Sequence, residues 1–229
     1  MRGALGHQLS ARQAALLILS AIALLLAGCG GGTTATPAAL RLEREDFLAV
    51  SRGLMSARPS VDREVTAAKA AWPLIANGIP ADTNAIPRAP IATAETAAAA
   101  ILAPPVFAEG NAASLTGSAA KLAGMFNSFS GLAERGWHLT GAAIEQIEHG
   151  TPVSARFARG NAGLYIESIY DGHFILAQVG KQVRDGYRAL GGPAAFGAAL
   201  TQAEVDTLAD AYSEANDRLH PHVGVRVGS

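Results

Sequence analysis

The stretch GAAIEQIEHGTPVSARFARG, residues 141–160, contains the turn on which the fold depends. Gly150 suits the left-handed position that follows a helix, Thr151 suits an N-cap, and Pro152 suits the first turn of a new helix. The three residues therefore predict that one helix ends at His149 and that another begins directly after Thr151. Because the connection is so short, the two helices are expected to run antiparallel as a hairpin.

Helical periodicity supports both arms of this hairpin. Between Gly117 and His149, small and apolar residues recur at steps of three and four, which places them on one helical face. They are Leu122, Phe126, Phe129, Ala133, Gly136, Thr140, Ala143 and Ile147. A helix of this length extends about 50 Å. The second arm is expected to continue to Leu190, where Gly191, Gly192 and Pro193 stop it.

The C-terminal helix has its own start signal. Thr201 and Glu204 form a capping box, in which each side chain can bond to the backbone N–H of the other residue. Leu200 and Val205 occupy the positions of a hydrophobic staple around this cap. Five apolar positions then form one stripe: Val205, Leu208, Tyr212, Ala215 and Leu219. These signals predict a helix from Thr201 to about Leu219.

The N-terminal part of the chain is expected to form a helix pair over residues 43–76. Apolar residues keep helical spacing on both sides of Pro59. Because proline lacks a backbone N–H and clashes with the preceding turn, we expect the first helix to end there and Ser60 to cap the second. Residues 77–90, which contain one glycine and three prolines, are interpreted as a linker.

Together these patterns predict an all-α fold. We expect a helix bundle that consists of a long antiparallel helical hairpin plus a capped C-terminal helix, preceded by the N-terminal helix pair. The whole is expected to be a single domain over residues 41–229, with the bundle core at 117–219. No segment shows the alternating period of a strand.

The N-terminus resembles a lipoprotein signal. A short apolar run, Ala14–Ala27, follows Arg2 and Arg12 and ends in Leu26-Ala27-Gly28-Cys29. This ending resembles the lipobox of bacterial lipoproteins. The resemblance implies that residues 1–28 are a signal peptide that is removed, and that Cys29 is diacylated and binds membrane lipid. The protein would then be membrane-anchored and extracytoplasmic, in the bacterial cell envelope, with residues 29–40 as a flexible tether.

Composition excludes some classes of function. Cys29 is the only cysteine of 229 residues, so its acylation would leave no thiol for a disulfide, a thiolate metal site or a cysteine nucleophile. Removal of Arg2 and Arg12 leaves 16 basic and 19 acidic residues, a net charge of −3, which gives no support for nucleic-acid binding. The sequence contains no glycine-rich phosphate loop, HExxH or GxSxG motif. No cofactor is therefore expected.

Candidate binding residues lie in the second arm of the hairpin. Ile166, Tyr170 and Phe174 form a row at steps of four. The opposite side is predicted to carry the main apolar stripe, which comprises Phe157, Leu164, Ile175, Val179, Val183 and Leu190. The middle of this helix is thus apolar nearly all round. The row either contacts a partner or ligand, or packs against the N-terminal helices.

Titratable residues accompany this row. Glu167 and Asp171 are one turn apart and share a helical face with each other, and His173 is close in sequence. If that face were buried, the pKa of at least one carboxylate would rise, as a general acid or a metal site needs. If it is exposed, the two are the solvated margin of a core helix. A second, weaker metal candidate consists of His220 and His222 with Asp217 one turn back.

Three functions remain open at this point. The first is a membrane-anchored lipoprotein whose helical, non-catalytic domain binds another envelope protein. The second is a helical metal-binding protein or hydrolase-like enzyme that uses the Glu167, Asp171 and His173 region. The third is a carrier that holds an apolar small molecule between helices. An apolar groove without buried charge favours the first or the third, and Glu167 and Asp171 converging with a histidine in a closed pocket favour the second.

Overall fold

The computed structural model describes residues 36–75, 79–80, 82–86 and 88–219, and in this part of the chain every regular element is helical. The α-helices are α2 (Pro37–Ile75), α3 (Arg88–Ala99), α4 (Glu109–Ala112), α5 (Gly117–His149), α6 (Pro152–Ala189), α7 (Gly192–Phe196) and α8 (Gln202–Leu219). Short 3-10 turns are η1 (Thr83–Ala85), η2 (Pro105–Phe107) and η3 (Gly197–Ala199). The predicted all-α helix bundle is confirmed. The predicted signal peptide and Cys29 lie outside the described residues.

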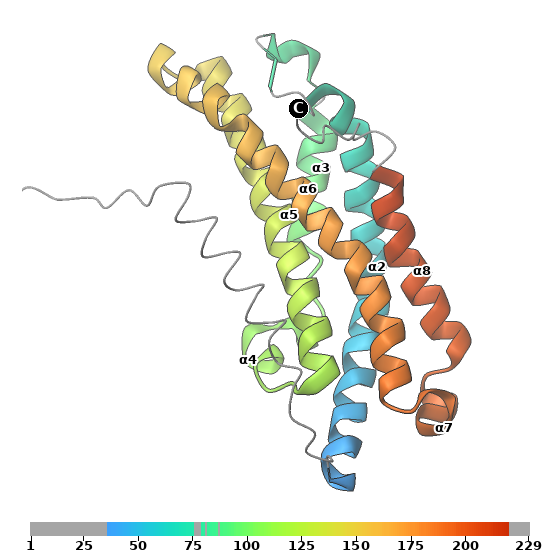
Figure 1. Ribbon diagram of the computed structural model, residues 1–229. Coiled ribbons are helices and arrows are strands. Elements are labelled where there is room, and N and C mark those ends of the chain that lie inside the picture. Colours follow the sequence, from blue (N-terminus) through green and yellow to red (C-terminus); the bar gives the residue numbers. More distant parts are fainter. Residues whose placement is uncertain (1–35, 76–78, 81, 87, 220–229) are drawn as a thin grey trace, which may run out of the picture. The chain divides into compact units, whose positions relative to one another are not determined.

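The hairpin of α5 and α6 has the predicted ends. Thr151 caps α6, because its side chain accepts a hydrogen bond from the backbone N–H of Ser154. Figure 1 shows the two helices side by side, with α8 beside the C-terminal half of α6. One detail differs from the prediction. Gly150 has a φ of −80° and is extended rather than left-handed, and a side chain there would clash with the carbonyl oxygen of Gln146.

The start of α8 also agrees with its sequence signals. The backbone N–H of Thr201 donates to Glu204 Oε2 at 2.8 Å, and the Glu204 N–H donates back to Thr201 Oγ1 at 3.3 Å. These bonds lower the pKa of the Glu204 carboxyl below its usual range. Leu200 and Val205 are both buried, as a hydrophobic staple requires. The predicted capping box is therefore confirmed.

The predicted N-terminal helix pair is wrong, because α2 is a single helix that contains Pro59. Pro59 is exposed, so the carbonyl that loses its helical partner there can bond to water. Buried residues recur at helical spacing across the proline, from Leu54 and Ala57 to Val61. Burial of this continuous stripe outweighs the local preference of Pro59 for ending a helix.

Two further predicted boundaries differ from the structure, and in both cases helix replaces part of a segment predicted to be irregular. The predicted tether ends at residue 40, whereas α2 already begins at Pro37. The predicted linker over residues 77–90 ends in helix, because α3 begins at Arg88 and places Pro90 in its first turn, where a missing N–H removes no helical bond. Both differences extend helices into segments that composition alone marks as irregular.

Helix α2 completes the bundle core. Phe47 packs against Gly186 of α6, and Glu64 lies against His173, so α2 runs antiparallel to α6. Tyr212 of α8 donates to the Leu54 carbonyl oxygen at 2.7 Å. The core is thus larger than the predicted 117–219. Glu64 lies beside His173, and α2 ends about three turns after Glu64. Because α6 begins about six turns before His173 and runs in the opposite direction, its first turns extend past the end of α2.

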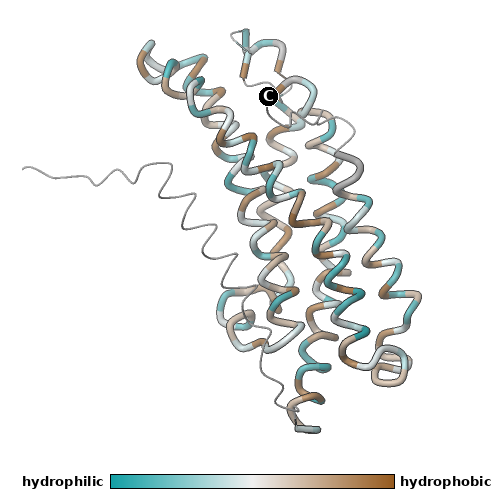
Figure 2. Tube along the Cα trace, viewed as in Figure 1, coloured by the Kyte–Doolittle hydropathy of each residue, from teal (hydrophilic) through white to brown (hydrophobic). Residues whose placement is uncertain are grey.

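Hydropathy along the helices follows this packing. Figure 2 shows hydrophobic and hydrophilic residues alternating along each helix, as expected when one face is buried and the other is solvated. Aromatic rings fill the centre, where Phe126 contacts Phe107, Phe129 and Tyr212 at centroid distances of 4.7, 6.0 and 5.7 Å. Among the described residues, none of the helices combines the length and apolar character needed to cross a membrane.

Candidate functional site

The row predicted as a binding face is divided between core and surface. Ile166 is buried, Tyr170 is half-buried against the core, and Phe174 is 54 % exposed. The interpretation as core therefore holds for Ile166, whereas contact of the row with a partner or ligand stays a prediction. Ile166 belongs to the bundle core, and of these three residues Phe174 alone presents a large apolar side chain to solvent. These three residues do not form one continuous surface.

The structure does not bring the titratable residues of α6 together. Glu167 and Asp171 are on the exposed side of the helix, whereas His173 points into the core. Partial burial and the negative charge of Glu167 raise the pKa of the Asp171 carboxyl. The acidic pair is therefore an exposed margin rather than part of a closed pocket with a histidine.

His173 instead forms a buried polar network with residues of α2 and α5. Its Nε2 lies 2.9 Å from Glu64 Oε2, and its Nδ1 donates to the Ile169 carbonyl oxygen at 2.8 Å. The indole Nε1–H of Trp137 donates to the other carboxylate oxygen of Glu64 at 2.6 Å. All three side chains are fully buried, so the network joins three helices through one carboxylate.

The protonation of this network follows from its geometry. Because the Ile169 carbonyl only accepts, His173 Nδ1 must carry a proton, and one further proton lies between Nε2 and Glu64. Burial acts to lower the pKa of His173, but the charge of Glu64 and its hydrogen bond, together with the bond to Ile169, outweigh it and raise that pKa. The arrangement is therefore suited to an imidazolium paired with a carboxylate.

Sequence reasoning missed Glu64 and Trp137, although a signal was present. Glu64 lies between Val61 and Ala68 at helical spacing, so it occupies the buried stripe of α2. Trp137 borders the buried stripe of α5, and a carboxylate within an apolar stripe needs a partner. The combination of an inward carboxylate with an inward imidazole on another helix is the pattern that could have found the network.

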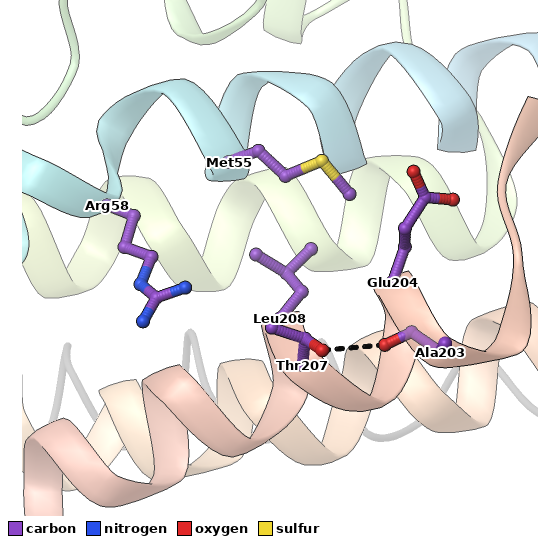
Figure 3. A pocket seen from close by; sticks show the side chains of 6 residues that line it. All are labelled: Met55, Arg58, Ala203, Glu204, Thr207 and Leu208. Atoms are coloured by element: carbon purple, nitrogen blue, oxygen red, sulfur yellow. Dashed lines mark hydrogen bonds between the residues drawn. The ribbon is translucent and has the colours of Figure 1, made fainter.

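In two open grooves on the bundle, polar side chains of the lining bond to other groups of the protein. One groove of about 350 Å³ lies between α2 and α8 and is lined by Met55, Arg58, Ala203, Glu204, Thr207 and Leu208 (Figure 3). Its Thr207 hydroxyl donates to the Ala203 carbonyl oxygen at 2.8 Å, and its Glu204 carboxylate caps α8. These polar groups therefore stabilise their own helix.

A second groove of about 340 Å³ separates α3 from α5. Glu95 Oε1 lies 2.8 Å from His138 Nδ1 across it, and Arg88 pairs with Glu145 and Glu148. Within the described residues, no cluster of three or more histidine, cysteine, aspartate or glutamate side chains is arranged to hold a metal. His220 and His222 lie outside these residues, so their metal site with Asp217 stays a prediction.

An exposed apolar row lies at the start of α6. Val153, Phe157 and Leu164 are 80, 69 and 52 % exposed and share one face of the helix. The prediction that Phe157 and Leu164 belong to the main apolar stripe is wrong. At this level the inward positions are small residues, Ala155, Ala158 and Ala162, which let α6 lie close to α5 and turn the larger side chains outward. We call Val153, Phe157 and Leu164 the α6 apolar row.

Comparison of the chain with protein-family models, with curated proteins and with solved structures found no match.

Proposed function

We propose that this protein is a lipid-anchored component of the bacterial envelope whose helical bundle is a non-catalytic interaction domain. In this proposal Cys29 carries the anchor and the α6 apolar row makes the contact. The observation that carries the second part is the exposure of three large apolar side chains on one face of one helix. Single exposed apolar residues are ordinary, but a contiguous group marks an interaction surface.

The buried network supports the same proposal in a different way. Glu64, His173 and Trp137 have the residue types of a reactive site, but each of them is fully buried and hydrogen-bonded to another member or to backbone. Such a network fixes how helices meet. The enzyme alternative would need Glu167 and Asp171 beside His173, and the carrier alternative would need an enclosed apolar cavity, so the observations favour them less.

Replacing the proposed lipidation site should release the protein from the membrane. We expect Cys29→Ser to move the chain from the membrane fraction to an uncleaved precursor or a soluble form, because two acyl chains give stable attachment. Fractionation of cells that express each version, followed by mass spectrometry of the N-terminal peptide, measures this. Normal cleavage before residue 29 and unchanged membrane retention of the variant would contradict the anchor.

A photoreactive residue on the α6 apolar row should capture a protein in the membrane. We expect the crosslinking amino acid at position 157 to give a discrete higher-mass product, because Phe157 is at the centre of the row. The matched control is position 178, which is also exposed on α6 but lies beyond the row. Equal yields at the two positions, or no product from either, would refute the row as the contact surface.

A further inference from the structure

Two glycines of α6 lie next to the apolar row and are not enclosed by the described part of the chain. A Cβ built on Gly160 or Gly163 would meet no atom of the described residues within 4 Å. Elsewhere on α6 the glycines are tightly enclosed, since a Cβ on Gly180 would lie 2.5 Å from the Ala209 carbonyl oxygen and one on Gly186 would lie 2.5 Å from Phe47. Glycine is among the poorest helix formers, so the two open glycines lower the stability of α6, and no close contact in the described residues compensates for this.

Open glycines alone do not indicate a contact, as α5 demonstrates. Gly124 and Gly131 have equally open surroundings. Their exposed neighbours on α5 are polar and include Lys121, Ser128 and Arg135. On α6, by contrast, Gly160 lies one turn from Phe157 and one turn from Leu164. Of these two helices, α6 is the one in which an exposed apolar face coincides with positions at which another helix backbone can approach closely.

The charged residues beside the row can pair with those of a second copy of α6 that runs in the opposite direction. Arg156 and Glu167 are both exposed, and they lie about three turns apart on the same flank of α6. Among the described residues neither has an ion-pair partner in the chain. In an antiparallel pair of identical helices, each flank faces the same flank of the other copy. A two-fold axis between residues 161 and 162 therefore places Arg156 opposite the second copy's Glu167.

The same axis satisfies the other features of this face. It places Gly160 opposite the second copy's Gly163, so the backbones meet where side chains are absent. Phe157 and Leu164 then flank the crossing on either side. Asp171 comes level with the start of the second copy's α6, where the positive end of the helix dipole favours a carboxylate. This single alignment of the two helices thus accounts for the open glycines, the apolar row, and the charges of Arg156, Glu167 and Asp171.

We propose that the occupant of the α6 apolar row is a second copy of this chain, bound antiparallel through α6 in a two-fold symmetric dimer. This inference rests on the proposed function, because it names the partner of the same surface. Such an interface uses one patch twice and closes on itself. Copies anchored in one membrane meet at high effective concentration, which lets a small interface suffice.

The charge pattern favours a second copy over a lipid bilayer. Glu167 and Asp171 continue the face that bears the row, and an anionic membrane would repel these carboxylates. Surface-binding helices instead carry mainly lysine and arginine beside their apolar face. An antiparallel copy places a positive group opposite Glu167 and a positive helix end opposite Asp171, so these carboxylates gain partners.

A charge swap between two tagged copies of the full-length chain tests the dimer. Wild-type copies with different affinity tags, co-expressed and solubilised in mild detergent, are expected to co-purify. Arg156→Glu in both copies, or Glu167→Arg in both, should lower recovery of the second tag at least about tenfold, because like charges then face each other twice. One Arg156→Glu copy with one Glu167→Arg copy should restore recovery, since both contacts become opposite in sign.

The controls separate this inference from the proposed function. Arg188→Glu reverses an exposed charge at the far end of α6 and should leave co-purification unchanged, and melting curves verify that each variant is folded. Failure of the mixed pair to restore recovery, or absence of wild-type co-purification, would overturn the dimer. In that case a position-157 crosslink to a different protein would leave the proposed function standing. Crosslinking to lipid alone, or to nothing, would overturn both.

Discussion

Replacing Glu64 by alanine is expected to lower the free energy of unfolding by about 3–5 kcal/mol. The substitution removes the carboxylate that accepts from Trp137 Nε1 at 2.6 Å and pairs with His173 at 2.9 Å. Both partners are fully buried, so water cannot replace the lost bonds without opening the bundle. The imidazole, which is favoured as a cation by Glu64, would also lose its compensating charge. Chemical denaturation followed by circular dichroism measures the difference.

Three controls test the origin of this loss. Glu64→Gln keeps the shape and can still accept from Trp137, so it should destabilise the protein less than alanine does. Glu64→Met combined with His173→Leu removes both charges and should recover stability relative to Glu64→Ala, because apolar replacement of a buried pair leaves no unpaired group. Glu134→Ala, at an exposed position of α5, should change stability by less than about 0.5 kcal/mol. A similar small change for Glu64→Ala would contradict the proposed role of the network.

The effect of the network should also depend on pH in a defined direction. The folded-state pKa of His173 lies above its ordinary value of about 6.5. The stability that its protonation contributes is therefore fully present below about pH 6.5, and it is lost as the pH rises through the folded-state pKa. The difference in unfolding free energy between the wild type and the Glu64→Met, His173→Leu double variant, which has no titratable group at either position, should shrink over that range. A difference that grows as the pH rises there would contradict the raised pKa.

Local chemical signals predicted most of the bundle. The ends of α5, α6 and α8 follow from Gly150, Pro152 and the Thr201 capping box, because such residues act within one turn of their own position. Pro59 illustrates the limit of this reasoning. Its effect on the helix is also local, but burial of the α2 stripe on both sides of it depends on packing against α5, α6 and α8. The local sequence around Pro59 therefore does not predict that the helix continues through it.

The candidate surface was harder to predict for a related reason. Periodicity places Phe157 and Leu164 on one face of α6, but it does not tell which face turns inward. The size of the side chains suggested the wrong face, because the hairpin packs closely through Ala155, Ala158 and Ala162 instead. Glu64 and His173 are far apart in sequence, so the helical stripes can indicate that both side chains point inward, but not that they meet.

The close packing of the hairpin gives a second large expected effect. Gly136 of α5 is buried against α6, and a Cβ there would lie 2.5 Å from Ile169 Cγ1 and 2.9 Å from the Tyr165 carbonyl oxygen. The second atom belongs to the backbone, so no rotation of a side chain can make room. Gly136→Val must therefore push the two helices apart. It would also disturb Trp137, the next residue along the chain.

We expect Gly136→Val to lower the free energy of unfolding by about 3 kcal/mol, near the upper end for overpacked cores. The control is Gly131→Ala on the same helix, where a Cβ would meet no atom of the described residues within 4 Å. That variant should raise the free energy of unfolding by up to about 1 kcal/mol, because alanine is the better helix former. Opposite signs at two glycines of one helix would show that contact with α6, rather than helix propensity, decides the result. Stabilisation by Gly136→Val would mean that α5 and α6 are further apart at this level than the structure places them.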